Sequence, residues 1–181
     1  MTLKACFRCL LATGLAFFMA QSAWAVDSVS LEIGDGDYTQ LVRVGLQSQW
    51  QKRWWQSNGT HVGGYWDLTF SQWRWSASPG ATQSYQHLTE VGITPVWRFQ
   101  SDTQKGFYSE IGIGAHWLSE YYDNNGDRFS TRFQFGDHIG VGYVLQNGMD
   151  ISLKIQHFSN AGIDQPNPGV LFGVLKVGYA F

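Results

Sequence analysis

The residue types best suited to chemistry in this sequence are a histidine and a serine two positions apart, His157 and Ser159. Side chains at positions i and i+2 of a β-strand point to the same side, with Cα atoms about 6–7 Å apart, so an imidazole can reach the hydroxyl. A serine beside a general base is the minimal activated nucleophile. The spacing therefore indicates nucleophilic catalysis by the serine, and it leaves open the alternative that both residues lie at a solvated strand end.

An acid that orients the histidine is expected in such a unit, and Asp137 is the candidate. If residues 146–148 form a three-residue turn between antiparallel strands, Asp137 falls directly opposite His157. Opposed Cβ atoms are about 4.5–5.5 Å apart, which is within hydrogen-bonding reach of the two side chains. A register slip of two residues keeps both on one face. The alternative is that Asp137 is a charge at the rim.

The residues after the serine, Asn160-Ala161-Gly162, offer hydrogen-bond donors. The side-chain amide of Asn160 and the backbone N–H groups of this turn, including that of Gly162, are candidates for an oxyanion hole.

Metal and cofactor chemistry is not indicated. The other histidines, His61, His87, His116 and His138, lack metal-ligand spacing. Residues 123–127 are reminiscent of a calcium loop, but the distal glutamate of such a loop is missing. We therefore expect no metal and no cofactor.

The elements that must position these residues are β-strands, because polar and apolar residues alternate with a period of two through most of the chain. Gly, Asn, Asp and Pro punctuate the alternation and mark turns, for example at Ser78-Pro79-Gly80. The pattern predicts eight strands, at about 28–35, 39–50, 61–75, 85–100, 107–120, 130–145, 149–159 and 169–181. The boundary between the first two is the weakest, since they could form one kinked strand.

Four features favour an eight-stranded antiparallel transmembrane β-barrel over a soluble lipocalin-like barrel or sandwich. Many segments exceed the 9–11 residues that a tilted spanning strand needs. The chain ends in an aromatic residue, Phe181, on an alternating strand, and aromatic residues gather near strand ends as in interfacial girdles: Trp50, Trp54, Trp55, Trp73, Trp75, Trp97 and Phe99. One face carries ionisable groups that would make a poor soluble core: Glu90, Arg98, Glu110, His116, His138, Lys154 and Lys176.

Residues 1–25 have the features of a secretory signal peptide, with Lys4 and Arg8 before an apolar run and Ala23-Trp24-Ala25 as the cleavage site. Residues 26–181 then form the barrel domain. Both cysteines, Cys6 and Cys9, lie in the signal, so the mature chain would have no disulfide or thiolate nucleophile. A formal net charge of −2, with no Lys/Arg run, argues against a nucleic-acid partner.

The sequence resembles the PagL family of outer-membrane lipid A 3-O-deacylases. The resemblance spans nearly the whole mature chain and rests on the H-[FY]-S-N-A-G block, His157 to Gly162, and on these further segments: 51–56, 64–67, 112–114, 136–140 and 165–167. It implies an eight-stranded barrel in the outer membrane of a Gram-negative bacterium, reached by Sec-type export. It also implies hydrolysis of the acyl ester at position 3 of lipid A, with Ser159 as nucleophile, His157 as base and Asn160 at the oxyanion.

The substrate implied is therefore lipid A or lipopolysaccharide, reached on the lipid-facing wall, and a homodimer is left open. Arg128 and Arg132 are candidates for meeting the lipid A phosphates, with solvated charges at the barrel rim as the alternative. One position departs from the family, which has a glutamate twelve residues after the serine, where this chain has Leu171. Asp137 could supply the acid instead, or a dyad could operate. A non-catalytic structural or adhesive barrel and a lipid-binding barrel remain the alternatives.

Overall fold

The computed structural model describes residues 25–36, 38–76, 85–124 and 126–181. The signal peptide up to Trp24 and the turn expected at 78–80 lie outside these residues. The long strands of the described part are β1 (Ser28–Gly36), β2 (Thr39–Gln49), β4 (Thr60–Ser76), β5 (Tyr85–Ser101), β6 (Gly106–Leu118), β9 (Phe133–Val144), β10 (Met149–Ser159) and β11 (Val170–Ala180).

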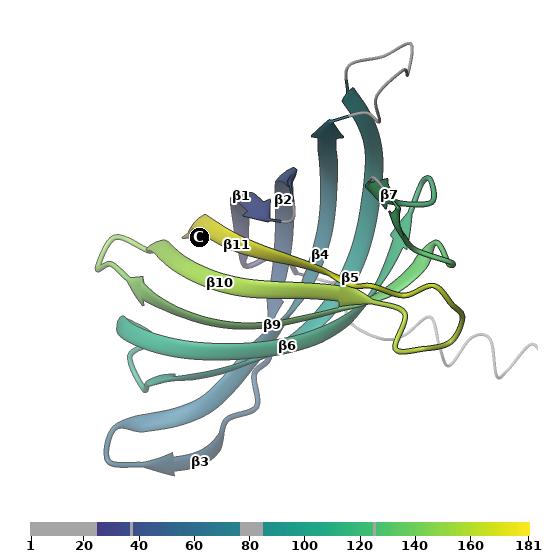
Figure 1. The fold of residues 1–181 in the computed structure, drawn as a ribbon. Helices are drawn as coiled ribbons and strands as arrows, with labels where there is room; N and C mark the ends of the chain where they lie inside the picture. Colours follow the sequence, from purple (N-terminus) through teal and green to yellow (C-terminus); the bar gives the residue numbers. More distant parts are fainter. Residues whose placement is uncertain (1–24, 37, 77–84, 125) are drawn as a thin grey trace, which may run out of the picture.

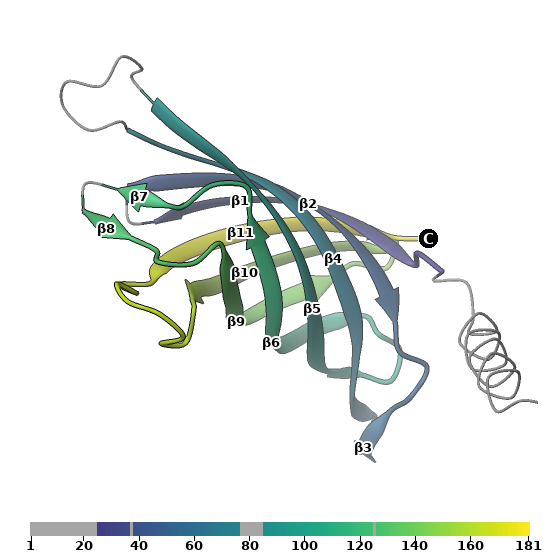
Figure 2. The ribbon, with the colours of Figure 1, turned by 90° about the vertical axis from the view of Figure 1, so that its right-hand side faces the viewer.

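These eight strands form a closed antiparallel barrel. Each pairs with its neighbour along the chain, and β1 also pairs with β11, which closes the ring in the order β1-β2-β4-β5-β6-β9-β10-β11. Figure 1 shows β9, β10 and β11 side by side, and Figure 2 shows the curved wall from another side. A closed ring leaves no strand edge, so the backbone polar groups of the wall are satisfied without water. The eight-stranded barrel predicted from the alternation is confirmed.

Three short strands were not predicted. β3 (Trp54–Ser57) pairs with the start of β4, and β7 (Asp123–Asn124) pairs with β8 (Asp127–Arg128) in a small hairpin between β6 and β9. The hairpin is visible beside the barrel end in Figure 2. The insertion shortens the two strands that flank it, since β6 ends at Leu118 and β9 begins at Phe133.

Alternate side chains face the interior and the outside, as predicted. The seven ionisable residues expected in the interior are all buried. The aromatic assignment was wrong at Trp73 and Trp75, which are 0% and 3% exposed. On β4 the even-numbered residues face outward at this point, so both tryptophans enter the barrel rather than a girdle.

The interior has a charged middle whose members are paired. Glu32 accepts hydrogen bonds from Arg43 Nη1 at 3.2 Å and Lys154 Nζ at 2.7 Å, and Glu90 lies 2.5 Å from His116 Nδ1. Pairing offsets the cost of burying charges in a region without bulk water. A cavity of about 110 Å³ lies nearer the chain termini and is lined by Arg98, Asp150 and Lys176 among others.

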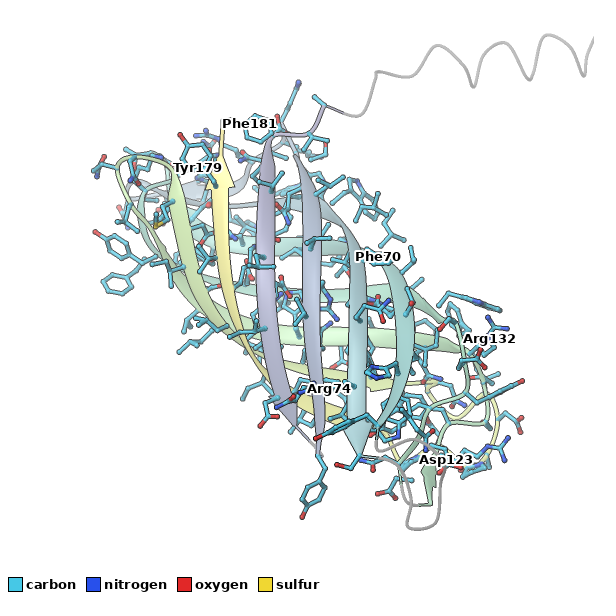
Figure 3. The ribbon with its side chains drawn as sticks, turned by 90° about the horizontal axis from the view of Figure 1, so that it is seen from above. Phe70, Arg74, Asp123, Arg132, Tyr179 and Phe181 are labelled. Carbon is cyan, nitrogen blue, oxygen red and sulfur yellow. The ribbon has the colours of Figure 1, made fainter. Side chains whose placement is uncertain are left out.

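An apolar cluster fills the opposite end of the interior. The ring of Trp73 lies 4.8 Å from that of Phe158, 5.0 Å from that of Phe172 and 6.0 Å from that of Tyr122, measured between centroids. Figure 3 shows Tyr179 and Phe181 at one end of the barrel and Asp123 at the other. The apolar cluster therefore lies beneath the loops at the end away from the C-terminus. Within the described residues, no helix is long and apolar enough to span a membrane.

Candidate functional site

The residues predicted to do chemistry lie on the outer wall, at the end of β10 where the chain enters the 160–169 loop. His157 pairs with Asp137 of β9 on one side and with Leu171 of β11 on the other. The pairing of Asp137 with His157 predicted from the 146–148 turn is confirmed. Leu171, at the position where the family has a glutamate, is therefore the second cross-strand neighbour of His157.

Asp137 and His157 are joined by a hydrogen bond on the outer face. His157 Nδ1 lies 3.2 Å from Asp137 Oδ1, and the side chains are 40% and 51% exposed. A carboxylate at this nitrogen favours the tautomer that carries its proton on Nδ1 and leaves Nε2 as the acceptor. This is the state that a general base requires.

Gly169 shows where the other nitrogen points. A Cβ atom at Gly169 would stand 2.6 Å from His157 Nε2, and the φ of +77° at this glycine disfavours any other residue. Gly169 is one step beyond the last β10–β11 pair, Phe158 with Val170, which places it across from Ser159. Nε2 of His157 is thus directed toward the next pair of opposed residues along the two strands, which contains Ser159. In the described part of the chain no hydrogen bond joins Ser159 to His157.

The two residues that flank His157 anchor this strand end from inside. Gln156 accepts a hydrogen bond from Arg43 Nη1 at 2.5 Å, and Phe158 packs against Trp73 and Phe172. Phe158 is fully buried. Because the backbone is held at 156 and 158, the outward direction of the side chains at 157 and 159 is set by the pleat.

Asn160 is buried and holds the loop together. Its Nδ2 donates to Ser130 Oγ at 3.0 Å and to the Asp164 carbonyl oxygen at 2.9 Å, while its Oδ1 accepts from the Gly162 N–H at 2.9 Å. The Asn160 N–H donates to Asn167 Oδ1 at 3.0 Å. Both residues expected to form the oxyanion hole, Asn160 and Gly162, are therefore hydrogen-bonded within the loop.

Reasoning from the sequence missed Gly169 and the anchoring roles of Gln156 and Phe158. The run Pro166-Asn167-Pro168-Gly169 signals a turn, but nothing in it shows that a histidine ring fills the space over the glycine. Among the described residues no group of three or more His, Cys, Asp or Glu side chains is arranged to hold a metal. The charged cavity near the termini lies at the far end from His157.

Comparison with known proteins gives a consistent result. The profile of the family described as "Lipid A 3-O-deacylase (PagL)" matches residues 40–180. A "Lipid A deacylase PagL" of Bordetella bronchiseptica is 38% identical over 179 residues, covering 92% of this chain and 90% of that protein. A protein of the same name from Pseudomonas aeruginosa is 32% identical over 151 residues, covering 82% of this chain and 83% of that one.

The fold agrees with a solved structure, "Crystal structure of the outer membrane enzyme PagL", with a TM-score of 0.71 and 27% identity; the match covers 85% of this chain and 99% of that one. The family profile spans most of the chain, and both relatives match it over more than four fifths of its length. The chain therefore belongs to the PagL family of lipid A 3-O-deacylases, which are ester hydrolases built on an outer-membrane β-barrel.

Proposed function

We propose that this protein hydrolyses the acyl ester at position 3 of lipid A, with Ser159 as nucleophile, His157 as general base and Asp137 as the acid that orients the base. The observation that supports this proposal most strongly is the outward-facing Asp137–His157 hydrogen bond of 3.2 Å, with Nε2 of the ring directed toward the pair of opposed residues that contains Ser159. The group faces the lipid, so a membrane lipid reaches it without entering the barrel.

The chemistry proceeds in two halves. Ser159 Oγ attacks the ester carbonyl while His157 Nε2 takes the proton of the serine hydroxyl. The imidazolium then donates this proton to the departing sugar oxygen, which leaves as a hydroxyl. This leaves an acyl group on Ser159. A water molecule, deprotonated by His157, then attacks the acyl carbonyl and releases the fatty acid with regeneration of the serine. The reaction consumes one water and needs no cofactor.

Asp137 takes the place of the family's glutamate in this proposal. The family position, Leu171, lies on the opposite side of the same histidine. Antiparallel pairing gives each outward residue of β10 two cross-strand neighbours, so an acid on β9 can orient the ring as well as one on β11. The Asp137 carboxylate accepts a hydrogen bond from the Nδ1–H group of His157. It also stabilises the imidazolium that forms when Ser159 transfers its proton to the ring.

Asn160 and Gly162 remain the candidate oxyanion donors. Each would exchange one hydrogen bond within the loop for one to the substrate oxygen. The Gly162 N–H, now 2.9 Å from Asn160 Oδ1, belongs to an exposed residue, whereas the Asn160 amide is buried. We therefore assign the N–H of Gly162 to the oxyanion and the side chain of Asn160 chiefly to holding the turn.

Mass spectrometry of lipid A tests the proposal. Cells that produce the wild type are expected to lose the 3-linked acyl chain, whereas cells with Ser159→Ala or His157→Ala retain it. The double substitution costs little more than either single one, because members of a catalytic unit act non-additively. Ser109→Ala, at an exposed outward serine of β6, is the matched control and retains activity.

Two outcomes contradict the proposal. Full release by a folded Ser159→Ala protein would exclude the serine as nucleophile. Intact lipid A in the presence of folded, purified wild type would favour the non-catalytic barrel instead. Heat-modifiable migration on gels, which closed barrels usually show, verifies folding in each case.

A further inference from the structure

Arg132 lies at the loop end of the barrel, immediately before β9, and is partly buried. Its Nε donates to the Leu118 carbonyl oxygen at 2.8 Å, and its guanidinium carbon lies 5.6 Å from the centre of the Trp117 ring. Trp117 is 55% exposed and belongs to the outward face of β6. Figure 3 shows Arg132 at the edge of the barrel, on the side away from Tyr179 and Phe181. The guanidinium is therefore presented at the surface by an aromatic ring.

The register places this guanidinium near the serine. Ser159 pairs with Phe135 on β9. Arg132 precedes Phe135 by three residues, on the side of the loops. With strands about 4.8 Å apart and about 3.3 Å per residue, the Cα atoms of Ser159 and Arg132 are roughly 11 Å apart. Phe133 and Phe135, whose rings meet edge to face at 5.1 Å, occupy the outer wall between them. The sugar of a glycolipid can bridge this distance.

Arg132 differs from the interior arginines in its charge balance. Arg43 and Arg98 each have carboxylate partners, at 3.2 Å and 2.7 Å in their shortest ion pairs. Across the described residues, Arg132 makes no ion pair, and its two Nη atoms make no hydrogen bond. A cation beside an exposed tryptophan, at the loop end of the wall, is at the level where lipid headgroups lie. The two Nη atoms of Arg132 thus have no hydrogen-bond partner among the described residues and are available to a lipid headgroup.

We propose that Arg132 binds a phosphate group of the lipid substrate and thereby sets the preference of the site for phosphorylated glycolipids; this inference rests on the proposed function. A guanidinium offers parallel N–H donors that match two phosphate oxygens. The Nε–Leu118 bond and the Trp117 ring fix its plane, so less conformational freedom is lost on binding. Anchored at Arg132, the sugar lies over Phe133 and Phe135 with its ester directed to Ser159.

The test compares two substrates with two substitutions. Initial rates of fatty-acid release are measured on bisphosphorylated lipid A and on enzymatically dephosphorylated lipid A, in the same detergent micelles. Arg132→Gln removes the charge but keeps an amide that can donate to the Leu118 carbonyl oxygen. We expect this variant to lose about 10-fold or more in kcat/KM on the phosphorylated lipid, as for loss of a charge-assisted contact, and to match the wild type on the dephosphorylated one.

Arg74→Gln is the matched control. Arg74, like Arg132, lies beside an aromatic ring, with its guanidinium 5.0 Å from the centre of the Tyr85 ring. It is an exposed residue of β4 and donates to Gln40 at 2.7 Å. It should leave both rates unchanged. Rising salt should also slow the wild type on the phosphorylated lipid more than it slows Arg132→Gln, because an exposed ionic contact is screened.

The outcomes separate the two proposals. Equal loss on both lipids would mean that Arg132 only holds the β6–β9 loop, and no loss on either would mean that it contacts no phosphate; both overturn the inference. Arg132→Lys provides a second variant that keeps the charge, and it should retain part of the preference for the phosphorylated lipid. If the folded wild type releases no fatty acid from either lipid, the proposed function itself fails.

Discussion

Replacing Asp137 with asparagine is the sharpest test of the proposed acid. Asparagine keeps the size of the side chain, but its amide can donate to His157 Nδ1 and so stabilise the tautomer with its proton on Nε2. That tautomer cannot accept the serine proton. In a fully buried triad, holding the histidine in this wrong tautomer lowers kcat about 10⁴-fold. Here the side chains are 40% and 51% exposed and lie at the loop end of the wall, so water at the membrane interface competes for both partners.

The expected magnitude follows from that exposure. Loss of a hydrogen bond to a charged group costs about 1.5–3 kcal/mol, and each 1.36 kcal/mol is a factor of ten in rate. We therefore expect kcat to fall roughly 10- to 150-fold in Asp137→Asn. Asp137→Ala should be less impaired than Asp137→Asn, since water can then solvate Nδ1 without holding the wrong tautomer.

The assay is steady-state release of fatty acid from lipid A in mixed micelles, with kcat and KM determined separately. The effect should fall on kcat, because Asp137 acts on the base rather than on the bound lipid. Asp127→Asn makes the same change at an exposed carboxylate of β8 and should have wild-type kinetics. Wild-type kcat in a folded Asp137→Asn protein, or a change in KM alone, would refute the role of this acid and leave a dyad as the better account.

Three further substitutions test the surroundings of the histidine. Adding Leu171→Glu to Asp137→Asn should restore part of the lost kcat, because a flip of the His157 ring turns Nδ1 toward the new carboxylate on β11. No rescue in this double variant would argue that the ring is fixed. Gly169→Ala should reduce kcat at least 10-fold, because the added Cβ would lie 2.6 Å from the imidazole. Gly59→Ala is its control and should leave kcat unchanged, because Gly59 has a similar φ of +75° but open space around it. Phe158→Ala should destabilise the barrel by about 3–5 kcal/mol in urea titration followed by gel shift.

Much of the barrel could be predicted because its determinants are local. A period of two in the residue pattern assigns each side chain to a face, and a three-residue turn at 146–148 fixes the register of β9 against β10. The distance between Asp137 and His157 follows from these alone. This is why Asp137 and His157, 20 positions apart, can be paired from the sequence alone.

The features that escaped prediction depend on contacts that the residue pattern along the chain does not encode. Trp73 and Trp75 are near a strand end, as girdle residues are, but the parity of β4 places them in the apolar cluster. The β7–β8 hairpin adopts its pairing within a connection whose composition only signals a loop. Asn160 has the residue type of an oxyanion donor, yet its amide is used by Ser130 and Asp164, neither of which its local sequence pattern singles out.

In the proposed mechanism, the outward direction of His157 and Asp137 also determines which measure of substrate concentration sets the rate. Their side chains open onto the bilayer and not onto the lumen, so an encounter with a lipid is a collision between two bodies that diffuse in one plane. The relevant variable is then the mole fraction of substrate in that plane, and diluting the membrane with inert lipid slows the reaction at constant bulk concentration. On this proposal the barrel acts as a two-dimensional catalyst, and the composition of the surrounding lipid sets its rate.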